Sequence, residues 1–257
     1  MLKKNLKEFF IDRIRKKLTI GFSKRAGRNF FGRKTIFTQG GGVFVKIRVI
    51  DFKRTLHCNG ILLSIEKDIN RTGFVGLICY ENGLYTYILL PLNYVQIGSY
   101  VYGFKNIFAM NYSTFLLNIP TGNFVHHIET IPGKGAKLAR AAGCSSFIIS
   151  NEDLNVVLKM NSGWLLKISK FCIAVVGAVS NNESYFKRLE KAGKNRNLGW
   201  KPRVRGVAMN PCDHPHGGGE GTGSPPRAHK TPWGKLTKIP TKRKKKFLLK
   251  KKLLKKF

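Results

Sequence analysis

The chain has 257 residues, of which 47 are Lys or Arg and 13 are Asp or Glu, so its formal net charge is +34. Hydrophobic residues make up 42% of it, which is enough to form a core and excludes a simple disordered basic peptide. An excess of positive charge this large would repel itself in a free protein, and it indicates a polyanionic partner, either nucleic acid or an anionic lipid surface.

The N-terminal segment, residues 1–42, is predicted to be a basic arm. Apolar residues between Leu2 and Leu18 recur at a loose helical spacing, which predicts a basic helix, either solvated or in contact with a partner. From Gly27 the segment is rich in glycine and arginine, and it ends in the triple glycine 40–42. Because glycine lets another backbone approach closely, this part is predicted to be extended.

Residues 43–118 are predicted to form a small closed barrel of short strands. Runs rich in β-branched and aromatic residues predict strands at four places, namely 43–50, 60–65, 73–78 and 84–90. The pair Asn82-Gly83 is a strong hairpin signal between the last two.

Residues 119–195 are predicted to form a second β-rich unit. Strands are expected at 147–149, 155–160 and 163–168, and one short helix at 184–193. The basic glycine loop 132–143 interrupts the strands. It contains Gly-Lys-Gly but no G-x-x-x-x-G-K-[ST] motif, so nucleotide hydrolysis has no support.

Residues 196–257 lose the strand pattern and are predicted to be an extended basic loop and tail. The loop 205–221 contains two prolines and a cluster of glycines, so it is neither a helix interior nor a central strand. A glycine-rich loop with arginine and histidine side chains suits threading between phosphate backbones.

His214 and His216 allow three interpretations. Catalysis would use Asp213 or Glu220 as the orienting carboxylate. A metal site would use Cys212, Asp213, His214 and His216, but the close spacing and Pro215 fit no standard zinc geometry, so no metal site is assigned. The third interpretation, that both rings stack on or hydrogen-bond to RNA, is the one we favour.

The last fourteen residues, 244–257, place leucines at helical spacing among lysines, so a helix there would have one apolar and one cationic face. Such a helix suits either an anionic membrane or RNA phosphates. Elsewhere the five cysteines form no C-x-x-C pair, which favours a reducing compartment, and the longest apolar run, 171–179, is too short to span a bilayer.

Four separated blocks resemble the universal large-subunit ribosomal protein "two" family. The longest is 204–221, with Ala208-Met209-Asn210-Pro211 and Asp213-His214-Pro215-His216-Gly217-Gly218-Gly219-Glu220-Gly221. The others are Thr231-Pro232-Trp233-Gly234, Asp51-Phe52-Lys53-Arg54 and the loop 132–143. The resemblance implies a mainly β fold, with an OB-fold barrel followed by an SH3-like barrel and extended basic N- and C-terminal arms.

The resemblance also implies a structural, non-enzymatic role in the large ribosomal subunit. Large-subunit rRNA and neighbouring ribosomal proteins are the expected partners, with a small-subunit bridge and a membrane contact of the tail left open. No cofactor is expected, since structural Mg²⁺ would be held mainly by the rRNA. The residues expected to bind rRNA are Arg28, Asn29, Arg33, Gly40, Gly41, Gly42, Arg48, Lys53, Arg54, Lys134, Gly135, Arg140, Arg203, Arg205, Met209, Asn210, His214, His216, Gly217, Gly218, Gly219, Trp233 and Lys235.

His214 is expected near the peptidyl transferase centre of the rRNA. The family has a His and a Lys after the triple glycine, where this chain has Val43-Phe44. That departure, together with abundant Lys, Asn, Ile and Phe, favours a mitochondrial ribosome, with a plastid or a bacterial cytoplasm as the alternative.

Overall fold

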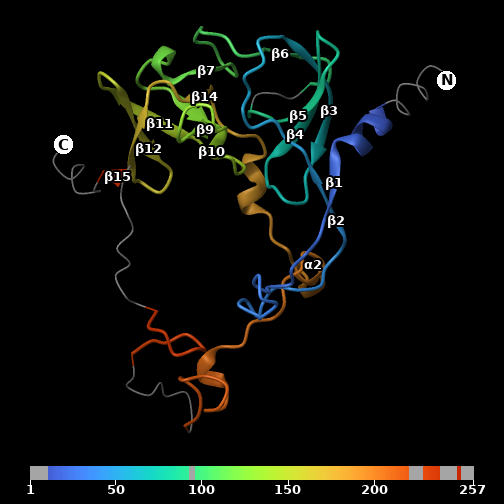
Figure 1. Ribbon diagram of the computed structural model, residues 1–257, viewed down its shortest axis with the longest axis vertical. Coiled ribbons are helices and arrows are strands. Elements are labelled where there is room, and N and C mark those ends of the chain that lie inside the picture. Colours follow the sequence, from blue (N-terminus) through green and yellow to red (C-terminus); the bar gives the residue numbers. More distant parts are fainter. Residues whose placement is uncertain (1–10, 93–95, 220–227, 238–247, 250–257) are drawn as a thin grey trace. The chain divides into compact units, whose positions relative to one another are not determined.

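The computed structural model describes residues 11–92, 96–219, 228–237 and 248–249, which fall into two compact units (Figure 1). The first unit takes its described residues from 11–22, 44–188 and 248–249. The second takes them from 23–43, 189–219 and 228–237.

The first sheet of the first unit is curled, as an OB-fold requires. Its strands are β3 (Gly60–Lys67), β4 (Phe74–Tyr80), β5 (Tyr85–Leu89) and β6 (Tyr100–Val101), and a separate two-stranded sheet is formed by β1 (Thr19–Phe22) and β2 (Val45–Arg48). The four strands of the first sheet pair in the order β5-β4-β3-β6, and β1 pairs antiparallel with β2. A parallel bridge between Ile50 and Tyr87 connects the chain after β2 to β5. The predicted Asn82-Gly83 hairpin is confirmed, with Gly83 at a φ of 78°.

Two apolar clusters stabilise this sheet on its two faces. One contains Leu62, Ile78 and Ile88, all nearly inaccessible to solvent. In the other, Ile14 of the N-terminal helix packs with Tyr87 and neighbouring strand residues. The described part of that helix, residues 11–17, is therefore held to the barrel by its apolar side, and Arg13, Lys16 and Lys17 remain exposed.

The second sheet is also curled and agrees with an SH3-like barrel (Figure 1). Its strands pair in the order β15-β13-β12-β11-β8-β14-β7, and β9 pairs with β10 beside them. Their bounds are β7 (Ser113–Phe115), β8 (Phe124–His126), β9 (Ile128–Glu129), β10 (Ala136–Leu138), β11 (Ser146–Asn151), β12 (Asn155–Met160), β13 (Leu165–Ser169), β14 (Ile173–Val176) and β15 (Leu248–Leu249), with η1 (Leu116–Asn118) after β7. The predicted mainly β architecture with two barrel-like sheets is confirmed.

The single helix predicted at 184–193 is wrong. The structure has instead a 3₁₀ turn, η2 (Asn182–Phe186), and a separate helix, α2 (Ala192–Asn197). Glu190 between them has a φ of 58°, a left-handed conformation that interrupts a right-handed helix.

The predicted amphipathic tail helix lies outside the described residues except at Leu248–Leu249, which pair with Leu165 and Leu166 of β13 as a strand. Within the described chain, no helix is both long enough and apolar enough to cross a membrane.

In the second unit, the triple glycine lies against the chain segment that follows α2. Gly40 donates a backbone hydrogen bond to Gly199 (3.0 Å), and Val43 donates one to Asn197 (3.0 Å). A Cβ on Gly42 would lie 2.7 Å from the Asn197 carbonyl oxygen, so only glycine fits there. Around Gly41, in contrast, a Cβ would meet nothing within 4 Å.

Candidate nucleic-acid interface

Two of the sequence motifs, from different sheets, meet within the first unit. Ala136, next to the predicted residue Gly135, donates a backbone hydrogen bond to the Phe52 carbonyl (2.8 Å). Asp51 shapes the other side, because its Oδ1 accepts hydrogen bonds from the backbone N–H groups of Lys53 (2.9 Å) and Arg54 (3.1 Å). Lys53 and Lys134 both remain exposed, so this junction presents basic side chains from both motifs.

The ring of Phe52 organises the arginines at this junction. The guanidinium carbons of Arg71 and Arg140 lie 4.7 and 4.9 Å from its ring centroid. Burial and the charge of Arg140 lower the pKa of Arg71. Two cations held this close repel each other, and a phosphate nearby would relieve that repulsion. Arg140 was predicted from the sequence, whereas Arg71 was missed because it belongs to no motif.

Glu129 holds the loop that carries Lys134. Its side chain is buried, and its two oxygens accept hydrogen bonds from the backbone N–H groups of Gly133 (3.2 Å), Gly135 (2.7 Å) and Ile173 (3.1 Å). Gly135 has a φ of 78°, which favours glycine, and its N–H points to the carboxylate. The basic loop is therefore fixed by an internal anion that sequence reasoning missed.

Two predicted residues of the first unit are engaged inside the protein. Arg54 is only 4% exposed, and its Nη2 donates to the Tyr102 carbonyl (3.3 Å). Arg48 is partly buried and its Nε donates to Glu66 (2.8 Å).

In the second unit, the predicted residues Arg28, Asn29 and Arg33 form one tight turn. Asn29 Oδ1 accepts a hydrogen bond from the Arg33 backbone (3.0 Å), and both arginines are exposed. At the tip, Phe30 and Phe31 are 87% and 81% exposed, which is unusual for side chains this apolar. Their signal in the sequence is an aromatic pair between two arginines, a combination that suits stacking on unpaired bases.

The loop containing the two histidines folds back on itself. Gly217 donates a backbone hydrogen bond to the His214 carbonyl (2.8 Å), and Gly218 donates one to the Met209 carbonyl (3.1 Å). A Cβ on Gly217 would lie only 2.2 Å from the Asn210 carbonyl oxygen. Gly217 thus serves the fold of the loop, whereas a Cβ on Gly219 would meet no atom of the described residues within 4 Å.

Both imidazoles accept hydrogen bonds from the backbone. His214 Nδ1 accepts from the His216 N–H (3.0 Å), and His216 Nε2 accepts from the Lys230 N–H (2.8 Å). These bonds assign the neutral tautomers, with the proton on Nε2 of His214 and on Nδ1 of His216. His216 is only 9% exposed and stacks on His229 with a centroid separation of 5.9 Å, so it closes the loop. His214 is the more accessible of the two rings.

Trp233 stacks on Phe37 with centroids 5.6 Å apart, which joins the turn 231–235 to the N-terminal arm. The Trp233 side chain is still 58% exposed. Of the other predicted residues, Arg203, Arg205, Asn210 and Lys235 are exposed and Met209 is partly buried. Among the described residues, no group of three or more His, Cys, Asp or Glu side chains is arranged to hold a metal ion.

Two family models match the chain. The model described as "Ribosomal Proteins L2, RNA binding N-terminal domain" matches residues 15–103, and "Ribosomal Proteins L2, C-terminal domain" matches residues 111–234.

Several bacterial proteins named large ribosomal subunit protein uL2 are similar to this chain. The protein of Rhodospirillum rubrum is 46% identical over 225 residues, covering 87% of this chain and 80% of that protein. The protein of Wolbachia pipientis wMel is 45% identical over 229 residues, covering 88% and 83%. The protein of Rickettsia canadensis is 43% identical over 242 residues, covering 92% and 88%.

Proposed function

Because the chain belongs to the ribosomal protein L2 family, we propose that it is a structural constituent of the large ribosomal subunit and binds large-subunit rRNA. The observation that carries this proposal most directly is the junction where Lys53, Lys134 and Arg140 of two sequence motifs gather together with Arg71. Lys and Arg paired with phosphates supply affinity, and the ordered loops fix the position of the protein by shape.

The proposed contacts fall into two groups. Exposed groups, such as those of Arg28, Arg33, Lys53 and Lys134, touch rRNA directly. Buried groups, such as Arg54 and His216, hold the loops that present them.

His214 is the proposed contact near the peptidyl transferase centre, where its Nε2–H would donate to the RNA. The protein supplies position and no catalytic group, and it needs no cofactor of its own, because structural Mg²⁺ is held mainly by the rRNA. The relatives compared above are bacterial, which favours a ribosome in a bacterial cytoplasm over the mitochondrial one that the sequence led us to predict.

Binding of the purified chain to large-subunit rRNA at several salt concentrations tests this function. The logarithm of the association constant should fall linearly with the logarithm of salt concentration, by about 0.9 for each phosphate contacted in a duplex. An excess of small-subunit rRNA should not displace the bound large-subunit rRNA. Equal competition by both rRNAs, or binding to anionic vesicles with the rRNA left free, would contradict the proposal.

A further inference from the structure

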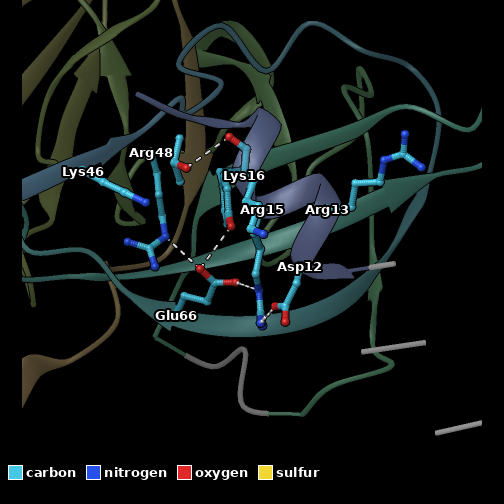
Figure 2. Close-up of a pocket in the computed structure, with 9 residues that line it drawn as sticks. Asp12, Arg13, Arg15, Lys16, Lys46, Arg48 and Glu66 are labelled. Carbon is cyan, nitrogen blue, oxygen red and sulfur yellow. Dashed lines mark hydrogen bonds and ion pairs between the residues drawn. The ribbon is translucent and has the colours of Figure 1, made fainter. Parts of the chain in front are cut away.

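The first unit also has a cationic hollow whose lining includes no residue of the sequence motifs. This hollow has a volume of about 500 Å³ and is lined by the N-terminal helix and by β1, β2, β3 and β5 (Figure 2). Two acidic side chains, Asp12 and Glu66, line it together with five basic ones, Arg13, Arg15, Lys16, Lys46 and Arg48. The lining therefore carries three more positive than negative charges.

Glu66 holds several side chains of this hollow in place. Its side chain is 9% exposed and accepts four hydrogen bonds, from Arg15 Nε (2.7 Å), Arg48 Nε (2.8 Å), Ser64 Oγ (3.0 Å) and the Tyr87 hydroxyl (3.1 Å). Burial acts to raise the pKa of Glu66, but the hydrogen bonds from Arg48 and Ser64 and the charges of both arginines outweigh it, so the pKa lies below its ordinary value. The ionised carboxylate fixes two guanidinium groups by their Nε atoms, as Figure 2 shows.

The remaining cations are not neutralised within the described chain. Asp12 pairs with Arg15 (2.8 Å) and the buried Asp68 pairs with Arg48 (3.7 Å). Lys16 and Lys46 have no ion pair among the described residues, and both are exposed. Arg13 points away from Glu66 in Figure 2. Fixed guanidinium groups beside two mobile ammonium groups suit the oxygens of a phosphate.

The hollow is suited to a nucleic-acid backbone and not to a base. Its one aromatic lining residue, Tyr87, is fully buried and offers no free face for stacking. Its charged donors recognise phosphate and carry no sequence information.

We propose that this hollow binds a backbone phosphate of large-subunit rRNA, with Arg15 and Arg48 positioned by Glu66 and with Lys16 and Lys46 completing the site. This proposal rests on the proposed function, because it assigns a further contact to the same partner. It also gives the N-terminal helix a specific role in binding rRNA. The sequence alone was equally consistent with a helix that is only solvated.

Two matched double variants test the proposal in the full chain. Lys16→Ala/Lys46→Ala removes one lysine from the helix and one from the sheet within the hollow. Lys17→Ala/Lys67→Ala removes one exposed lysine from the helix and one from β3, and both of these lie outside the hollow. Both variants lose two charges from exposed positions, so both should keep the thermal unfolding midpoint of the wild type.

Affinity for large-subunit rRNA and its salt dependence are then compared. The variant of the hollow should bind about tenfold more weakly, with a salt slope smaller by about one phosphate contact, while the control stays close to wild type. An equal loss of rRNA affinity in both variants would overturn the proposed phosphate site but would not contradict the proposed function. Failure of the wild-type chain itself to bind rRNA would overturn the proposed function, and this site with it.

The variant Glu66→Gln distinguishes the effect of arginine positioning on rRNA binding from the effect of the net charge of the chain. The substitution makes the chain more positive, so simple electrostatic attraction would tighten rRNA binding. If Glu66 positions Arg15 and Arg48 for a phosphate, the variant should instead bind more weakly than wild type. Tighter binding would contradict the role given to Glu66.

Discussion

Replacing Glu129 with Ala should lower the free energy of unfolding of the first unit by about 3–5 kcal/mol. The reason is that its carboxylate accepts three backbone hydrogen bonds, from Gly133, Gly135 and Ile173, and two of these bonds are fully buried. Each buried donor left without a partner costs about 1–3 kcal/mol. Urea unfolding followed by tryptophan fluorescence, with Trp164 between β12 and β13 as the reporter, measures the change.

The matched control is Glu152→Ala. Glu152 follows β11 of the second sheet, and its side chain is 45% exposed and pairs with Lys167 at the surface. Exposed pairs contribute about 0–1 kcal/mol, so this variant should unfold almost as the wild type does. Equal destabilisation by the two substitutions would show that Glu129 does not hold the basic loop in the way described.

Lowering the pH from 7 to 5 should destabilise the first unit by about 2 kcal/mol through His126, and His127 should add to this loss. Burial, with the charge of Arg54, lowers the pKa of His126 to about 3, and the same causes lower the pKa of His127 well below its ordinary value. The unfolded chain binds protons at these two residues below about pH 6.5, and the folded protein does not. His126 therefore removes about 1.4 kcal/mol of stability per pH unit between pH 6.5 and pH 5, and His127 adds a loss in the same direction.

His126→Leu identifies the cause of this acid sensitivity. Within the described residues neither ring nitrogen of His126 has a hydrogen-bond partner, so an apolar side chain of similar size leaves no group unsatisfied. Between pH 6.5 and pH 5 the variant should lose about 2 kcal/mol less stability than the wild type. The Glu66 carboxylate does not interfere, because its stabilisation is lost only below its ordinary pKa near 4.5. An unchanged pH dependence in the variant would exclude His126 as a source.

The strands were predictable because their signals are local. Alternating β-branched runs and the Asn82-Gly83 turn locate β3, β4 and β5 within a few residues. The predicted helix at 184–193 failed because spacing alone cannot reveal the left-handed conformation of Glu190. Glu66 and Glu129 were missed for a different reason, since their partners Arg15 and Ile173 lie 51 and 44 residues away in the chain.

The motifs of the candidate site were predictable from the sequence, but the separate role of each residue within a motif was not. A motif contains residues that bind a ligand together with residues that fold the loop, and the sequence does not separate them. His214 and His216 look equivalent in the sequence, yet His216 is buried with its Nε2 bonded to Lys230, while His214 is more accessible. Gly217 and Gly219 differ in the same way, since only Gly217 packs against a carbonyl oxygen.

Sedimentation of a lysate from the source cells, with this chain followed by mass spectrometry, tests the central claim most directly. At high Mg²⁺ the chain should migrate with intact ribosomes, and at low Mg²⁺, where the subunits separate, it should stay entirely with the large one. A chain found in the light fractions, with membranes or with the small subunit would contradict a structural role in the large ribosomal subunit.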